Sequence, residues 1–261
     1  MKKILHLSDL HIGFGAMEES FQQLTQDLIA QLQPASDYII VITGDLVEKP
    51  VGTNQYQQAR DLLARLESAG FMVLAAPGNH DFNNGVVLDP SFLPRFNETF
   101  CGDPHLLYPT LNVIDDIAFI GLNSLEAEFN WYDRMFADGE LGKLQLQRLN
   151  ALLGDSIVCS CAHRVLYLHH HPFDSIPLSA LKDSRKLRRV IQKHGNVDVL
   201  LFGHNHLGRM CNGSWQVPRC YDGGSGTGKR PGRKRLRLID FCLSPEQDQD
   251  LAGGNGGSLF S

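Results

Sequence analysis

Six short aliphatic runs divide the chain and restrict what it can fold into. They are rich in valine, isoleucine and leucine and lack a long polar–apolar alternation, which is typical of strands covered on both faces. The runs are KILHLS at 3–8, DYIIVIT at 37–43, FMVLAA at 71–76, AFIGLN at 118–123, RVLYLH at 164–169 and VDVLLF at 197–202. Strands of this kind need helices or a second sheet on each side.

Helical periodicity separates these runs. In residues 18–33 the side chains of Phe21, Leu24 and Leu28 form one apolar stripe, and residues 54–69 repeat the pattern before Gly70, a good helix C-cap. Two more helices are expected over 142–154 and 180–195. Repeated strand, helix, strand units predict a layered α/β fold in which ligands bind at the carboxyl ends of the strands.

The last part of the chain has a different pattern. SWQVPRCYD at 214–222 and KRLRLIDFCL at 234–243 indicate antiparallel strands around a glycine-rich basic loop, residues 223–237. Part of this loop, GGSGTGKR, nearly matches a phosphate-binding loop, but Arg230 replaces the hydroxyl residue that would hold Mg²⁺. We expect this loop to be mobile and to lie near the mouth of the ligand-binding site. We also expect one domain over residues 1–243 and a disordered tail over 244–261.

Composition and charge favour some partners over others and leave room for a local basic patch. With 43% hydrophobic residues the 261-residue chain can bury a substantial core, and its net charge of −5 gives no general attraction to nucleic acid or anionic membranes. No apolar stretch approaches the roughly 18 residues of a membrane-spanning helix. The opening MKKILHLSDLH is interrupted by Asp9 and His11, so we interpret it as a strand and not a signal peptide. Six scattered cysteines favour reduced thiols and a cytoplasmic protein. The oligomeric state has no signal in the sequence.

Polar residues that can bind a metal ion follow five of the six strands. They are Asp9 and His11 in SDLH, Asp45 in TGDLV, Asn79, His80 and Asp81 in PGNHD, His169, His170 and His171 in HHHP, and His204 and His206 in GHNH. Carboxylate, amide and imidazole groups form a mixed oxygen and nitrogen set that suits divalent ions. Each motif alone is a weak signal, but five in this order predict a site with enough ligands for two ions.

At this point the chain resembles the calcineurin-like metallophosphoesterase superfamily, in its small bacterial-type phosphodiesterase branch. The resemblance covers residues 4–206 and implies a four-layer αββα sandwich of two mixed β-sheets flanked by helices. It also implies two divalent or trivalent ions, of manganese, iron or zinc. One ion would be held by Asp9, His11, Asp45 and His206, and the other by Asp45, Asn79, His204 and one histidine of HHHP.

The resemblance selects His170 from that run, because the family's ligand stands two residues before the proline or small residue that follows the strand. The rival is His169, which is preferred if the strand ends one residue earlier. By the same resemblance His80 would face the leaving oxygen as a donor or general acid, and Asp81 would orient His80.

The expected reaction is hydrolysis of a phosphodiester by a hydroxide that bridges the two ions. GDLVEKP lacks the arginine that follows the bridging aspartate in protein serine/threonine phosphatases. GLNSL and the helix after it look more like enzymes that act on cyclic nucleotides or glycerophosphodiesters, so the expected partner is a small-molecule phosphate ester. Two alternatives stay open: a manganese-dependent nuclease of the double-strand-break-repair type, which shares SDLH and would bind nucleic acid, and an inactive scaffold with the same fold.

Overall fold

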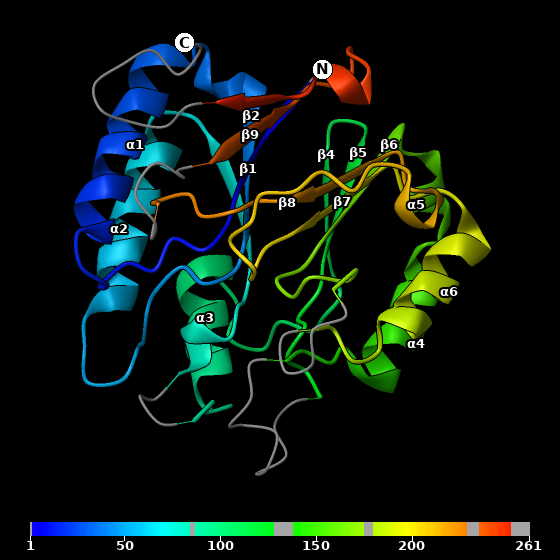
Figure 1. The fold of residues 1–261 in the computed structure, drawn as a ribbon, viewed down its shortest axis with the longest axis horizontal. Coiled ribbons are helices and arrows are strands. Elements are labelled where there is room, and N and C mark those ends of the chain that lie inside the picture. The colour runs from blue at the N-terminus through cyan, green and yellow to red at the C-terminus, as the bar shows by residue number, and fades with distance from the viewer. Residues whose placement is uncertain (1, 84–86, 128–137, 175–179, 229–234, 252–261) are drawn as a thin grey trace.

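The structure is a computed structural model that describes residues 2–83, 87–127, 138–174, 180–228 and 235–251. Two five-stranded sheets pack face to face at its centre (Figure 1). The first has the order β10-β9-β1-β2-β3 and the second the order β4-β5-β6-β7-β8. Their bounds are β1 Lys3–Leu7, β2 Tyr38–Thr43, β3 Met72–Ala76, β4 Thr110–Ile114, β5 Ile117–Gly121, β6 His163–Tyr167, β7 Val199–Phe202, β8 Arg219–Asp222, β9 Leu236–Ile239 and β10 Gln249–Leu251.

Helices cover the outer face of each sheet. In Figure 1, α1 and α2 lie on one side of the molecule and α4 and α6 on the other, with α3 below the first sheet. The helices are α1 Met17–Gln31, α2 Gln55–Ser68, α3 Phe92–Cys101, α4 Gly142–Leu152, α5 Ser156–Ser160 and α6 Ser184–His194. None of the helices in the described ranges is both long and apolar enough to cross a membrane.

Three apolar clusters hold the layers together. In β2, Ile39 and Val41 face the second sheet, whereas Ile40 and Ile42 pack against the first sheet's helices. Period-two alternation places successive side chains on opposite faces, so a strand between two apolar layers must be aliphatic throughout. This explains the continuous runs in the sequence, and the predicted αββα sandwich of two mixed sheets is confirmed.

The carboxyl-terminal part differs from the sequence prediction. β8 pairs in parallel with β7, whereas β9 pairs antiparallel with β1, so these two strands lie in different sheets and not in one hairpin. Cys220 of β8 packs in the apolar layer of the second sheet's helices and Leu236 of β9 in that of the first sheet's helices, whereas Tyr221 and Ile239 both lie in the layer between the sheets.

The predicted disordered tail also begins too early at residue 244. β10 pairs with β9, and Asp248 accepts hydrogen bonds from Arg219 and Tyr221, so residues up to 251 are anchored. β9 is therefore an inner strand, and Arg237 forms an ion pair of 2.7 Å with Asp250 of β10. Residues 252–261 lie outside the described ranges.

Candidate metal centre

The predicted ligands occupy turns at one end of both sheets. Asp9 and His11 follow β1, Asp45 follows β2 and Asn79 follows β3, while the histidines of HHHP and GHNH follow β6 and β7 in the second sheet. Parallel strands end at the same sheet edge, so the turns of each sheet converge. The backbone N–H of His204 donates to Asp9 Oδ2 at 3.1 Å, which joins the two sets across the sheet interface.

The first donor group contains Asp9, His11 and His206. The Nε2 atom of His206 lies 3.0 Å from Asp9 Oδ1 and 3.3 Å from the Nε2 atom of His11. At most one proton can lie between two imidazole nitrogens at that distance, so at least one lone pair is directed into the gap. Two imidazoles and a carboxylate around one point form a donor set that suits a divalent cation.

The second donor group contains Asp45, Asn79, His169 and His204. The Nε2 atom of His169 lies 3.1 Å from Asn79 Oδ1, 3.3 Å from Asp45 Oδ2 and 3.2 Å from His204 Nδ1. Asp45 Oδ2 also lies 3.8 Å from His11 Nε2 of the first group. The Asp45 carboxylate therefore stands between the two donor groups and can serve both.

The structure does not bring His170, the ligand selected in the sequence analysis, into either group. Its Nδ1 atom lies 2.7 Å from the hydroxyl of Ser124. The reason is the alternation of side chains: Leu168 still donates to Leu201 and His169 still accepts from Gly203, so the chain stays extended here and neighbouring side chains face opposite ways, His169 toward the donor groups and His170 toward Ser124.

A backbone contact sets the tautomer of His169. Its Nδ1 atom lies 2.8 Å from the carbonyl oxygen of Thr43, at the end of β2. That carbonyl can only accept, so Nδ1 carries the proton and the Nε2 lone pair of a neutral ring faces Asp45 and Asn79. A second hydrogen bond of this kind is what orients a metal-binding imidazole.

His80 lies beside the donor groups and remains partly open to solvent. Its backbone N–H donates to Asp45 Oδ1 at 2.8 Å, and its side chain is 26% exposed. The ring meets that of His11 edge to face at 4.7 Å. One ring nitrogen of His80 also lies within 4.8 Å of a carboxylate oxygen of Asp45. His80 can therefore act on a bound substrate, and its proximity to Asp45 also makes it a possible ligand.

Asp81 has a different partner from the one predicted. Its buried carboxylate accepts hydrogen bonds from the backbone N–H groups of Val47 and Gly78, at 3.1 and 2.9 Å, and so joins the second and third motifs. Burial and the charge of Asp45 raise the pKa of Asp81 to about 8. The contact is to the loop backbone, so Asp81 holds the turn that carries Asn79 and His80.

Glu48, which the sequence analysis missed, contacts the His80 ring instead. The Glu48 carbonyl oxygen lies 3.1 Å and its carboxylate 3.6 Å from His80 Nδ1, and the same carboxylate lies 2.9 Å from His11 Nδ1. The Glu48 carboxylate thus lies beside two imidazoles, and its backbone carbonyl can orient the His80 ring. The only signal was its place three residues after Asp45, in GDLVE.

The centre concentrates buried charge. Burial alone would raise the pKa of Asp45, but His169 and His80 outweigh it and hold that pKa well below its usual range. Burial would likewise lower the pKa of His169, yet the carboxylates of Asp45 and Asp9 raise it to about 9. Burial and the neighbouring His169 lower the pKa of His204 to about 4. Buried carboxylates of this kind require a positive partner, which a proton on His169 or a metal ion can supply.

Five residues of the centre have left-handed backbone conformations. The φ angles are 54° for Asp9, 46° for His11, 53° for Asp45, 76° for His204 and 56° for His206. Non-glycine residues rarely adopt positive φ, and they retain it where the surrounding structure fixes the turn. Tight turns of this kind direct several side chains from one short segment into the same space.

The glycine-rich segment 223–228 is one such fixing element and not the mobile loop that we expected. Ser225 donates to the Asp9 carbonyl at 3.0 Å, Thr227 donates to the Leu10 carbonyl at 2.8 Å, and Gly226 N–H donates to the Ser8 carbonyl at 2.8 Å. The segment therefore holds the turn that presents Asp9. Residues 229–234 of the predicted loop lie outside the described ranges.

Comparisons with known proteins agree with this geometry. A probable cyclic nucleotide phosphodiesterase from Moraxella catarrhalis is 26% identical over 78% of this chain and 70% of its own length. The DNA double-strand break repair protein Mre11 from Aeropyrum pernix is 34% identical, but over only 31% of this chain and 21% of its own. A dimetal phosphatase from Danio rerio has the same fold, with a TM-score of 0.67 at 15% identity over 97% of this chain and 99% of its own. Residues 2–208 match the calcineurin-like phosphoesterase family, and the chain belongs to that family.

Proposed function

We propose that the protein hydrolyses a small phosphodiester at a centre of two divalent ions. The observation that carries the proposal is the pair of donor groups that share the Asp45 carboxylate. Asp9, His11 and His206 with Asp45 would hold one ion, and Asn79, His169 and His204 with Asp45 the other. His169 takes the place of His170 in this set because of its distances to Asp45 and Asn79.

Two bound ions would polarise a phosphate oxygen and lower the pKa of a water molecule enough for it to attack phosphorus. Asn79 offers a neutral oxygen and therefore adds no negative charge that would repel a phosphate. Asp45 divides one negative charge between the two ion positions. Among the candidate ligands only Asp9 and Asp45 carry a negative charge, so two bound ions would keep a net positive charge that attracts a phosphate.

His80 would protonate the leaving alcohol. Glu48 accepts at Nδ1, so Nε2, on the opposite side of the ring, remains for the substrate. The partial exposure of His80 lets a leaving group approach, whereas His11 and His169 are fully buried. With Nδ1 fixed at the Glu48 carbonyl, the ring has the orientation that a general acid needs to place Nε2 at the leaving oxygen.

A cyclic nucleotide is the substrate class that we propose first. A relative described as a probable cyclic nucleotide phosphodiesterase aligns over most of the chain, whereas the Mre11 similarity is confined to 91 residues. A nuclease activity remains a second candidate on that local similarity alone. An inactive scaffold is disfavoured because all seven candidate ligands are present and close together. Manganese, iron or zinc as the ion, and a cytoplasmic location for a chain with six free cysteines, remain proposals.

The test is an activity panel on protein stripped with a chelator and reloaded with Mn²⁺, Fe²⁺ or Zn²⁺. Substrates would be bis-p-nitrophenyl phosphate, 3′,5′-cyclic AMP, a glycerophosphodiester, a phosphomonoester and single-stranded DNA. We expect the reloaded protein alone to be active, with the cyclic nucleotide preferred over the monoester. Asp45→Asn serves as the control for contaminating hydrolases. Equal activity of the stripped and reloaded proteins would refute the metal dependence, and a preference for DNA would support the nuclease.

A further inference from the structure

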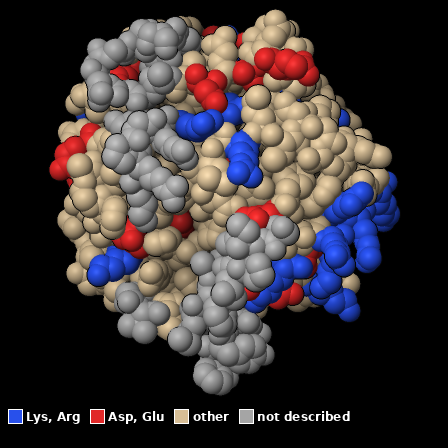
Figure 2. Space-filling model, in the orientation of Figure 1, with Lys and Arg blue, Asp and Glu red and all other residues tan. Residues whose placement is uncertain are grey.

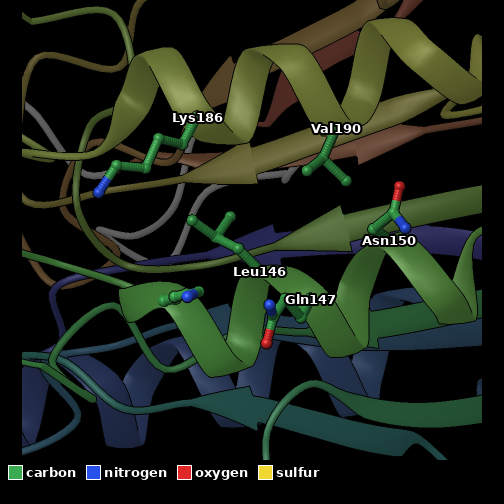
Figure 3. Close-up of a pocket in the computed structure, with 6 residues that line it drawn as sticks. Leu146, Gln147, Asn150, Lys186 and Val190 are labelled. Carbon is green, nitrogen blue, oxygen red and sulfur yellow. The ribbon is translucent and has the colours of Figure 1, made fainter.

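A groove lies between α4 and α6, on the outer face of the second sheet and formed by none of the candidate metal ligands. Its volume is about 520 Å³, and it is lined by Lys143, Leu146, Gln147 and Asn150 of α4 and by Lys186 and Val190 of α6. Figure 3 shows the side chains of Leu146 and Val190 extending into the gap between the two helices. Leu146 is only 6% exposed, so the groove has a recessed apolar floor.

Lys143 of α4 and Lys186 of α6 line this floor from its two sides. The sequences of the two helices contain no aspartate or glutamate, whereas α6 alone carries Arg185, Lys186, Arg188, Arg189 and Lys193. These side chains are exposed, and none of the five forms an ion pair with any residue in the described ranges. Figure 2 shows the resulting concentration of lysine and arginine on the side of the molecule where α4 and α6 lie. In a chain with a net charge of −5, this is a segregated positive surface.

We propose that the α4–α6 groove docks an acidic amphipathic helix of a partner protein. Unpaired positive charges on both sides of an apolar floor are complementary to a helix with an apolar stripe flanked by glutamate or aspartate. The lining residues span 143–150 on α4, a length of about 12 Å or two helical turns of a partner, and 186–190 on α6. The inference concerns a surface separate from the metal centre and does not depend on the proposed function.

The lining favours a peptide over nucleic acid or a membrane. Single-stranded nucleic acid binds through stacking on aromatic side chains, and the six residues that line the groove include none. A membrane surface contacts apolar side chains that protrude, whereas Leu146 lies at the bottom of the groove. An apolar side chain on a narrow helix can reach that floor while its acidic neighbours meet Lys143 and Lys186.

The experiment measures binding of fluorescein-labelled synthetic peptides to the full chain by fluorescence anisotropy. The probe has 16 residues, with leucines spaced at i, i+3, i+7 and i+10 and glutamates beside them. One control peptide has the same composition in shuffled order, and another has lysine in place of glutamate. We expect the probe to bind about tenfold more tightly than either control, and the difference to shrink as salt is raised.

Three variants locate the binding surface. Lys186→Glu should weaken binding about fivefold, whereas Arg65→Glu, a matched charge reversal at an exposed position of α2, should change it less than about twofold. Gln147→Trp leaves the charge unchanged and fills the groove, so it should also weaken binding. All three should hydrolyse bis-p-nitrophenyl phosphate as the unmodified protein does.

Several results would overturn the proposal. These are equal binding of the probe and its shuffled control, equal effects of Lys186→Glu and Arg65→Glu, and no effect of Gln147→Trp. Tighter binding of a single-stranded oligonucleotide or of phosphatidylserine vesicles than of the probe would assign the surface to another class of partner and would also refute it.

Discussion

Substitution of His169 by alanine tests the assignment of the second donor group most directly. The change removes a nitrogen that lies within 3.1 to 3.3 Å of three other donor atoms. Removing an outer partner of a metal ligand weakens binding about 10- to 100-fold, so loss of the ligand itself should cost about 100-fold or more. His169→Ala should therefore retain about one ion per chain where the unmodified protein holds two.

The same loss should appear as reduced stabilisation by metal. An ion at 100 times its dissociation constant stabilises a fold by about 2.7 kcal/mol, and a 100-fold weaker site under the same conditions contributes only about 0.4 kcal/mol. Urea unfolding with and without Mn²⁺ measures this difference. Elemental analysis after gel filtration counts the ions, and circular dichroism of the metal-free proteins confirms that each variant folds.

His170→Ala is the matched control from the adjacent position. It breaks the contact with Ser124, and the His170 ring lies 4.5 Å from that of His204 at a tilt of 41°, so we expect a weakening of about tenfold at most, typical of an outer partner. His170→Ala should keep both ions under saturating metal. The reasoning is refuted if His170→Ala loses an ion while His169→Ala keeps two.

Three further predictions follow from individual contacts. His80→Ala should keep both ions while kcat falls about 10²- to 10⁴-fold, with a smaller loss for substrates whose leaving alcohols are acidic; loss of metal would make His80 a ligand instead. Gly78→Ala should lose metal, because its Cβ would overlap the backbone nitrogen and Oδ1 of Asp45, and an unchanged metal content would contradict this packing argument. Burial and the charge of Arg237 lower the pKa of His6 to about 3, so the folded protein keeps this ring neutral while the unfolded chain protonates it near pH 6.5. The stability from His6 is therefore present above pH 6.5 and lost as pH falls toward 3, by about 1.4 kcal/mol per unit, and urea unfolding of His6→Gln should lack that slope.

The sequence predicted the parts of the fold that local pattern determines. Each of the six aliphatic runs overlaps a strand, and the four periodic segments overlap α1, α2, α4 and α6. β4 was missed because Leu111, Asn112 and Val113 are exposed at a sheet edge, so the strand lacks the continuous apolar pattern of buried strands. The pairing of β8 and β9 was predicted wrongly because sequence proximity favours a hairpin, whereas each strand completes a different sheet.

For the candidate site, the sequence predicted which segments meet but not which single residues face one another. The order of the motifs indicated the segments, because each motif follows a parallel strand. The selection between His169 and His170 depends on the alternation of side chains after β6, and a shift of one residue reverses which side chain faces the centre. Glu48 and Asp81 act through contacts to residues of other loops, Glu48 at His11 and Asp81 at Val47, which no spacing within a single motif encodes.

The left-handed turns of the centre impose a conflict between folding and metal binding. Each of the five positive-φ residues costs about 1 kcal/mol or more relative to glycine, and these are also the residues that glycine cannot replace chemically. In the metal-free chain this cost is opposed only by the packing of neighbouring residues. Hydrogen exchange should therefore be faster in the SDLH, TGD and GHNH turns than in the sheets. A variant selected for thermal stability alone would therefore be expected to accumulate glycine at these positions and to lose its ions. Screens for robust variants of this chain should accordingly be carried out with the metal present, so that the ligand turns contribute to the stability that is measured.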